Sequence, residues 1–137
     1  MNTCAFTIVA KNYIGLAMIL GKSLAKHNPY IDFKIVVADE IDGEVENLPD
    51  NLIIAKKELG YSSDIWTNMS FKYNLTEFCT AIKPAAFIRL FKEEYTKVIY
   101  FDPDIFIFSD ISCILSALDK FDVVLTPQIA GIHVDYS

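Results

Sequence analysis

Glycine and proline are scarce in this chain, at 5 residues each among 137. Collagen-like and low-complexity chains are rich in these two residues, so both classes are excluded. Charged residues make up 22% and hydrophobic residues 53%, whereas intrinsically disordered chains are poor in apolar side chains. A chain of this length and composition is expected to form one domain, residues 1–137, with a buried core.

Basic residues are also few. The chain has 12 lysines and arginines against 18 aspartates and glutamates, so its net charge is 12 − 18 = −6. Nucleic-acid binding without sequence preference uses clustered basic residues, and this composition argues against it. A phosphorylated ligand would be repelled as well, unless a cation or a local basic group offsets the charge.

Cysteines are few, and no apolar run is long. Cys4, Cys79 and Cys113 are odd in number and widely spaced, which supports neither a disulfide scaffold nor a CxxC metal site. We expect them to be small buried residues in a reducing compartment. The longest apolar run, residues 13–21, is too short to span a bilayer and follows no basic signal segment. We therefore expect a soluble, cytoplasmic protein, and peripheral contact with the inner membrane face is compatible with this sequence.

Short apolar runs alternate with stretches of helical spacing, in the order β-α-β-β-α-α-β-β-α-β. The runs are apolar throughout, as in strands buried on both faces of a mostly parallel sheet. The sequence therefore predicts an α/β fold, a three-layer sandwich around that sheet. Strands are expected at 4–10, 33–38, 52–55, 97–101, 105–108 and 122–125. Helices are expected at 13–26 and 112–120, and two further helices are expected to meet near Lys83 within 75–95. Residues 41–50 are expected to form a loop and residues 60–70 irregular structure.

The most informative feature is the Asp102-Pro103-Asp104 motif between two apolar runs. Ionised carboxylates in such a setting are unfavourable unless they are paired or bind a metal. Carboxylates at positions i and i+2 of an extended backbone point to one side, and oxygen ligands suit Mg²⁺ or Mn²⁺. The alternative is an ordinary Asp-Pro turn between two hairpin strands, because all three residues favour turns.

Two further candidates lie at the end of the first strand and near the start of a helix. Parallel sheets bind ligands beyond the carboxyl ends of their strands, where Ala10, Asn12 and Tyr13 lie. Tyr13 could stack on a base that Asn12 hydrogen-bonds, or Asn12 could cap the helix while Tyr13 packs on its side. Lys83 either faces an anion or extends to water, and Arg89 is an equal rival. The chain contains neither GxGxxG nor a P-loop motif, and no catalytic residue is assigned.

Residues 7–13 (TIVAKNY), followed by a helix, resemble the opening of GT-A fold glycosyltransferases of the glycogenin and lipopolysaccharide-galactosyltransferase type. Residues 97–107 (KVIYFDPDIFI) resemble the strand and metal-binding D-x-D motif of that group, and residues 71–90 resemble the helical segment before it. The resemblance spans about residues 6–127, and its most specific part is the two motifs in the right order.

The resemblance implies a glycosyltransferase donor domain that binds a nucleoside-diphosphate sugar, usually a UDP-sugar. Ala10, Asn12 and Tyr13 match the loop that holds the base. Asp104 matches the ligand of Mn²⁺ or Mg²⁺, and Asp102 matches the residue that reaches the metal, the ribose or the sugar. Lys83 lies near a basic residue that contacts the diphosphate. A divalent cation would explain how an acidic protein binds a phosphorylated ligand.

Enzymes of this group continue well beyond the fifth strand, with a third metal ligand, often a histidine, and most of the acceptor site. His133 is too close to the strand to be that ligand. We expect either the N-terminal, nucleotide-sugar-binding half of a larger enzyme or a short non-catalytic binding module. Both predict exposed apolar surface and self-association.

A second enzyme class also places D-x-D after an apolar strand. In haloacid-dehalogenase-like phosphatases the first Asp is the nucleophile, the second is the acid/base, and Thr or Val follows two residues later. Phe106 occupies that position here, which disfavours a phosphatase.

Overall fold

Four parallel strands form the centre of the computed structural model, which describes residues 2–41 and 48–127. Their order across the sheet is β3-β2-β1-β4, and every pairing is parallel. β1 (Thr3–Val9) lies between β2 (Asp32–Val37) and β4 (Lys97–Tyr100), and β3 (Leu52–Ile54) forms the edge beside β2. These four strands confirm the expected runs at 4–10, 33–38, 52–55 and 97–101.

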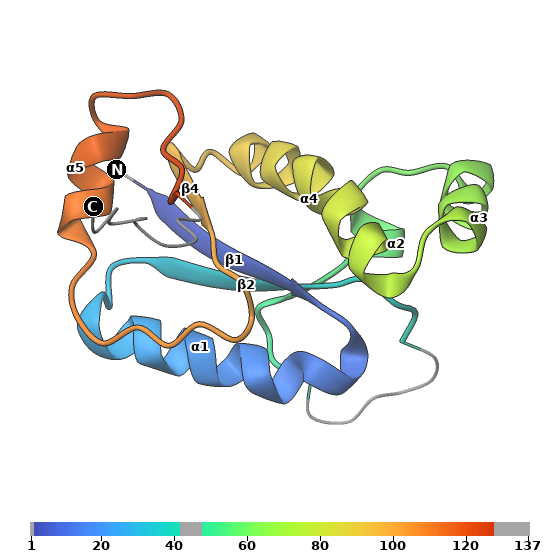
Figure 1. Cartoon of the computed structure of the whole chain (residues 1–137), viewed down its shortest axis with the longest axis horizontal. Coiled ribbons are helices and arrows are strands. Elements are labelled where there is room, and N and C mark those ends of the chain that lie inside the picture. The colour runs from blue at the N-terminus through green and yellow to red at the C-terminus, as the bar shows by residue number, and fades with distance from the viewer. Residues whose placement is uncertain (1, 42–47, 128–137) are drawn as a thin grey trace, which may run out of the picture.

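Helices cover both faces of the sheet, which confirms the three-layer α/β architecture (Figure 1). Because successive strand residues point to opposite faces, Phe6 and Ile8 of β1 pack on one layer while Ala5 and Val9 pack on the other. The first layer contains α2 (Ala55–Glu58), α3 (Ser63–Lys72) and α4 (Leu75–Lys92), and the second contains α1 (Ile14–His27) and α5 (Ser112–Leu118).

The expectation of irregular structure at 60–70 is wrong, because α3 occupies most of it. The cluster of polar residues that suggested a loop supplies the helix start instead. The Ser62 side chain accepts a hydrogen bond from the Ile65 backbone N–H at 3.3 Å, a typical N-cap. Trp66 then anchors the helix through its edge-to-face contact with Phe78, at 4.9 Å between ring centroids.

Two helices meeting near Lys83 were also expected, and that expectation is wrong. α4 is a single helix that begins at a capping box of Asn74 and Glu77 and continues through Pro84. Pro84 removes one backbone hydrogen bond, but it is exposed and lies off the packed face of the helix. That face is an unbroken stripe with one buried side chain every fourth residue: Phe78, Ile82, Ala86 and Leu90. Continuous packing against the sheet therefore overrides the proline.

The strand expected at 105–108 is absent, because side chains of α1 satisfy the backbone of this segment in place of a neighbouring strand. The Ile107 N–H donates to the Ser23 hydroxyl at 3.0 Å. Buried Asn28 accepts from the Ile111 N–H at 2.9 Å and donates to the Ser109 carbonyl at 3.3 Å. Ile107 and Ile111 are buried beneath these bonds. The segment is thus an ordered loop across the end of α1.

The strand expected at 122–125 is likewise absent, and residues 121–127 are exposed coil. An apolar run forms a strand only where a partner completes its hydrogen bonds, and no described residue pairs with this one. Large apolar side chains remain exposed in this coil, at Phe121, Val123 and Leu125, and at Phe108 in the loop before α5. Self-association through such surface stays a prediction. Most of the expected 41–50 loop, and His133, lie outside the described residues.

Replacing Asn28 by alanine is expected to destabilise the fold by about 1–3 kcal/mol, because the Ile111 N–H and the Ser109 carbonyl would lose their partner. Chemical denaturation would measure the loss. Asn68→Ala on the exposed face of α3 is the matched control, and it should change the free energy of unfolding by less than about 0.5 kcal/mol. Equal effects of the two variants would contradict the tethering role of Asn28.

Candidate functional site

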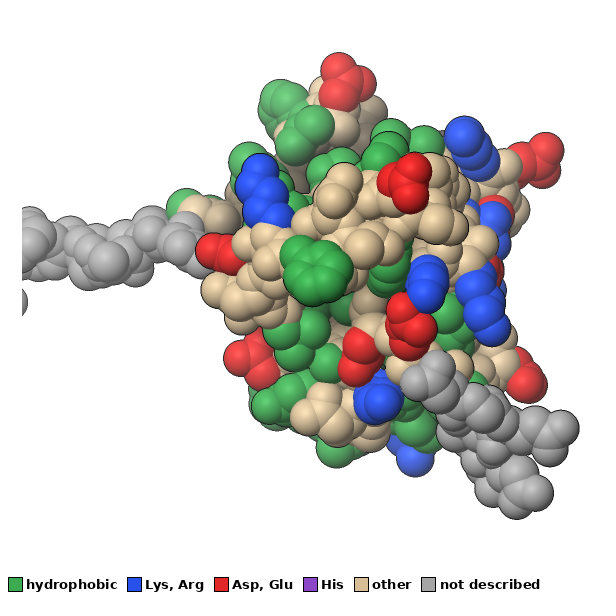
Figure 2. All heavy atoms as spheres, turned by 90° about the vertical axis from the view of Figure 1, so that its right-hand side faces the viewer, with side chains coloured by type: hydrophobic (Ala, Val, Ile, Leu, Met, Phe, Trp, Pro, Cys, Tyr) green, Lys and Arg blue, Asp and Glu red, His purple; other side chains and the backbone are tan. Residues whose placement is uncertain are grey.

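A cavity of about 450 Å³ lies where β1 and β4 end, at the carboxyl-terminal end of the parallel sheet. Its walls come from the end of β1, the start of α1, one face of α4, and the segment after β4. Figure 2 views the molecule from the side on which β1 and β2 end, and acidic, basic and apolar side chains are interspersed on that face. Five of the six candidate residues predicted from the sequence line this cavity: Ala10, Tyr13, Lys83, Asp102 and Asp104.

The sixth candidate, Asn12, is exposed and does not line the cavity. It lies in a short 3-10 turn, η1 (Lys11–Tyr13), that joins β1 to α1. The capping alternative is wrong, because the N-cap of α1 is Tyr13 and carries no side-chain cap hydrogen bond. Asn12 is thus on the same loop as the cavity residues Ala10 and Tyr13 but is not part of the lining.

This loop is held to the end of β2. The Tyr13 N–H donates to the Ala10 carbonyl at 2.9 Å, which closes the turn. The Lys11 N–H donates to a carboxylate oxygen of Asp39 at 2.6 Å, and the Ala38 N–H donates to the Val9 carbonyl at 2.9 Å. Asp39 follows β2, so a residue from a neighbouring strand fixes the loop on which Ala10 and Tyr13 lie.

The Asp102-Pro103-Asp104 motif forms a turn at the cavity rim. The Ile105 N–H donates to the Asp102 carbonyl at 3.1 Å, so the backbone is not extended across the motif as expected. The turn alternative is therefore right about the backbone and wrong about a hairpin, since no strand follows. Both carboxylates are exposed and both line the cavity, so a turn also brings them to one site.

Lys83 extends from α4 into the cavity, with its ammonium nitrogen 3.8 Å from the centre of the Tyr100 ring. Such a cation–π contact holds the charge at the cavity wall rather than in bulk water. Burial raises the pKa of the Tyr100 hydroxyl, and the nearby Asp102 and Asp104 carboxylates raise it further. Tyr100 therefore stays protonated at neutral pH.

Arg89, the rival of Lys83, does not line the cavity. Its guanidinium donates to Glu58 at 3.1 Å and pairs with Glu93 at 3.0 Å. Glu58 also accepts from the Ile54 N–H at 2.8 Å, so the network ties α2 and the end of β3 to α4. The structure thus gives Arg89 a structural role and leaves Lys83 as the cavity's cation from α4.

Sequence reasoning missed Tyr100 and four α4 residues that line the cavity: Leu75, Thr76, Cys79 and Thr80. A signal for the α4 residues was present. Positions 76, 80 and 83 follow helical i, i+4, i+7 spacing, so they share one face with Lys83. All three positions precede Pro84, so this shared face does not depend on whether the helix continues through the proline. No functional signal in the sequence marked Tyr100, because it lies within an apolar strand.

The donor set suits a hard divalent cation. Asp102 and Asp104 supply carboxylate oxygens, the ligands that Mg²⁺ and Mn²⁺ prefer, and both are accessible from the cavity. No third Asp, Glu, His or Cys joins them as a metal cluster within the described part of the chain. A cation held by two carboxylates keeps its remaining positions for water and phosphate oxygens. These residues therefore fit a metal that is bound jointly with a phosphorylated ligand.

The model of the family described as glycosyl transferase family 8 matches residues 4–126. The chain belongs to this family. Its members are glycosyltransferases with a nucleotide-sugar donor and a GT-A fold, and the parallel α/β sandwich described above is consistent with that fold. No curated protein and no solved structure gives a significant match. Over the described residues, no helix combines the length and the apolar character needed to cross a bilayer.

The cysteines differ in accessibility, contrary to the expectation that all three are buried. Cys4 is buried in β1, Cys79 is half-buried in the cavity wall, and Cys113 is exposed on α5. Burial raises the pKa of Cys4 to about 12 and raises that of Cys79, to which the charge of Asp39 also contributes. The thiolate, which is the reactive form, is therefore rare at both positions at neutral pH.

Alkylation by iodoacetamide at pH 8, followed by peptide mapping, is expected to modify Cys113 first, Cys79 more slowly and Cys4 last. Raising the pH should speed the reaction of Cys79, because a raised pKa means that its thiolate fraction is still increasing above pH 8. A Cys113→Ser variant is the control that isolates the two slower sites. Modification of Cys4 before Cys113 would show that the accessibility of these sites is wrong.

Proposed function

We propose that the cavity at the ends of β1 and β4 binds the nucleoside-diphosphate part of a sugar donor, a UDP-sugar, together with Mn²⁺ or Mg²⁺. One observation carries the proposal: Lys83, Asp102 and Asp104 line a single cavity with Ala10 and Tyr13, although they come from three separate parts of the chain. Membership of glycosyl transferase family 8 supports a nucleotide-sugar donor.

The proposed ligand lies along the cavity from the start of α1 to the Asp102-Pro103-Asp104 turn, here called the acidic turn. The Tyr13 side chain is half exposed, so its ring is free to stack on the base, and Ala10 lines the same cavity. Asn12, on the same loop, would contact the ribose or base only from the outer side. Lys83 would face the diphosphate, where an ammonium group pairs well with phosphate oxygens.

Asp102 and Asp104 would hold the metal, and Asp102 is also close enough to Tyr100 to raise its pKa. When bound, a divalent cation offsets the charge of the diphosphate and stabilises it as a leaving group. Lys83 adds a fixed positive charge to the same region, and Tyr100 keeps that charge at the cavity wall. The side chains and the metal would thus orient the donor and stabilise the charge on the diphosphate as the sugar–phosphate bond breaks.

The metal site is tested by titrating UDP into the protein by calorimetry with and without Mn²⁺. Asp104→Asn is expected to weaken Mn²⁺-dependent UDP binding by roughly tenfold or more, since a charge-assisted contact contributes about 1.5–3 kcal/mol. Chelation with EDTA should weaken binding by the wild-type protein in the same way.

Asp122→Asn is the matched control, because Asp122 is exposed and does not line the cavity. It should bind UDP with unchanged affinity. No binding of UDP by the wild-type protein, or equal binding after Asp104→Asn, would overturn the proposal.

Lys83 has a separate test based on the ligand's phosphates. Lys83→Met keeps the aliphatic stem but removes the charge, so UDP binding should weaken by roughly tenfold or more. Binding of uridine, which has no phosphate, should change little. An equal loss for uridine and UDP would mean that the substitution disturbs the cavity as a whole, and Lys83 would not be a diphosphate contact.

A binding module without transfer would use the same cavity and the same metal. The two forms are distinguished by incubating UDP-glucose or UDP-galactose with the protein and Mn²⁺, and measuring released UDP. Release that disappears in Asp104→Asn supports a catalytic donor site, and tight binding without release supports the non-catalytic form.

A further inference from the structure

Tyr100, the last residue of β4, contacts oppositely charged groups of the cavity at the ends of β1 and β4, here called the donor cavity. The Lys83 ammonium nitrogen lies 3.8 Å from the centre of its ring. Burial raises the pKa of the Tyr100 hydroxyl, and the interaction of that hydroxyl with the Asp102 carboxylate raises it further. One side chain therefore contacts the cation of the cavity with its ring and a proposed metal ligand with its hydroxyl.

The hydrophobic core holds this ring in place. The Tyr100 ring packs edge-on against Phe6, with the centroids 5.3 Å apart, and Phe6 packs edge-on against Phe87 at 4.9 Å. Phe6 is fully buried in β1, an interior strand of the sheet. A closely packed core leaves few alternative positions for its side chains, so the orientation of the Tyr100 ring does not depend on a bound ligand.

The charged groups of the donor cavity are not paired with one another. Within the described residues no ion pair joins Lys83 to Asp102 or Asp104, although all three line the same cavity. A lysine has a flexible four-carbon stem, so an unheld ammonium group is able to move toward nearby carboxylates. A cation–π contact is comparable in strength to an exposed ion pair, so the ring competes with the carboxylates for this group.

An ion pair within the cavity would use up the groups that the ligand needs. Lys83 would be lost to the phosphates, and the carboxylate oxygens would be lost to the metal. We propose that Tyr100 is a positioning residue, which holds Lys83 apart from Asp102 and Asp104 so that both charges remain available to the ligand. The proposal rests on the donor function proposed above, and it adds a residue that acts through Lys83.

The contact itself is tested by NMR of the lysine side chains, without metal or nucleotide. In ¹³C-labelled full-length protein, the ε-methylene signal of Lys83 is expected at higher field than the signals of exposed lysines, because an aromatic ring shields groups above its face. Lys83→Met identifies the signal by its loss. Tyr100→Phe should retain the shift, since it keeps the ring, and Tyr100→Leu should abolish it.

The consequence for the ligand is tested by calorimetric titration of UDP in the presence of Mn²⁺. Tyr100→Leu is expected to weaken binding by roughly tenfold, as Lys83→Met does, whereas Tyr100→Phe should stay within about threefold of the wild type. In the Lys83→Met background Tyr100→Leu should have little further effect, because residues in contact are not additive. Tyr30→Leu is the matched control, since Tyr30 is exposed and does not line the cavity, and it should bind normally.

The outcomes separate this proposal from the donor function. A Lys83 signal without the high-field shift in the wild-type protein would overturn it whether or not UDP binds, and this result needs no variant at Tyr100 to fold. A further tenfold loss from Tyr100→Leu in the Lys83→Met background, or equal losses for Tyr100→Phe and Tyr100→Leu, would overturn it as well. If the shift and its loss in Tyr100→Leu are seen while UDP fails to bind, the placement of Lys83 stands and the donor proposal fails.

Discussion

Parallel pairing of β1 with both β2 and β4 is the constraint on which the rest of this structure depends. All seven residues of β1 are buried, and the strand contributes side chains to the cores on both of its faces. Because all the strands run in one direction, their carboxyl ends lie at the same end of the sheet. The loop after β1, Asp39 after β2 and Asp102 after β4 are therefore close together. Burial of β1 thus stabilises the fold and assembles the candidate site at once.

The acidic turn has a second support, from a helix that is remote in sequence. Asn28, 83 positions before Ile111, bonds the backbone of the segment that leaves the turn, and Ser23 bonds it at Ile107. Polar side chains at the end of α1 therefore replace the hydrogen bonds that a neighbouring strand would have made. The position of Asp102 and Asp104 depends on these buried bonds as well as on β4.

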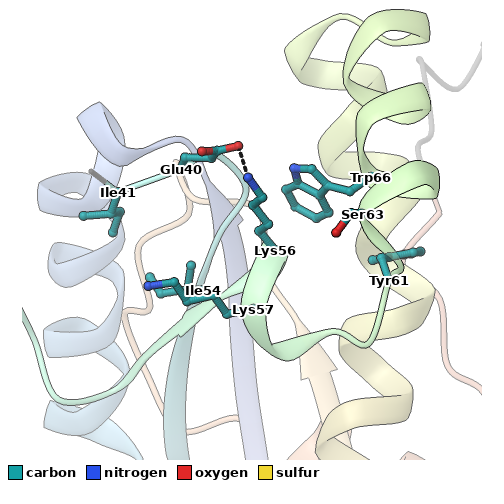
Figure 3. Close-up of a pocket in the computed structure, with 8 residues that line it drawn as sticks. All are labelled: Glu40, Ile41, Ile54, Lys56, Lys57, Tyr61, Ser63 and Trp66. Carbon is teal, nitrogen blue, oxygen red and sulfur yellow. Dashed lines mark hydrogen bonds and ion pairs between the residues drawn. The ribbon is translucent and has the colours of Figure 1, made fainter. Parts of the chain in front are cut away.

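At the carboxyl ends of the strands, two lysine side chains each have a local partner, although the net charge of the chain is −6. Lys83 is held over the Tyr100 ring at the donor cavity, and Lys56 forms an ion pair with Glu40 beyond the ends of β2 and β3 (Figure 3). The donor cavity therefore combines one cation with two carboxylates suited to a metal. That lining is what supports a phosphorylated ligand at the donor cavity.

The sequence by itself determined the layered α/β class, four of the strands, the D-x-D motif and the family resemblance, because apolar periodicity and short motifs are local properties. It could not determine that α4 continues through Pro84, since a stripe of buried residues against the sheet decides that. Nor could it show that residues 105–108 form no strand, because Ser23 and Asn28 take the place of a partner strand. Only the tertiary structure decided that Lys83 rather than Arg89 faces the cavity: folding brings Glu58 to the arginine, which Glu93, one turn along the helix, also binds.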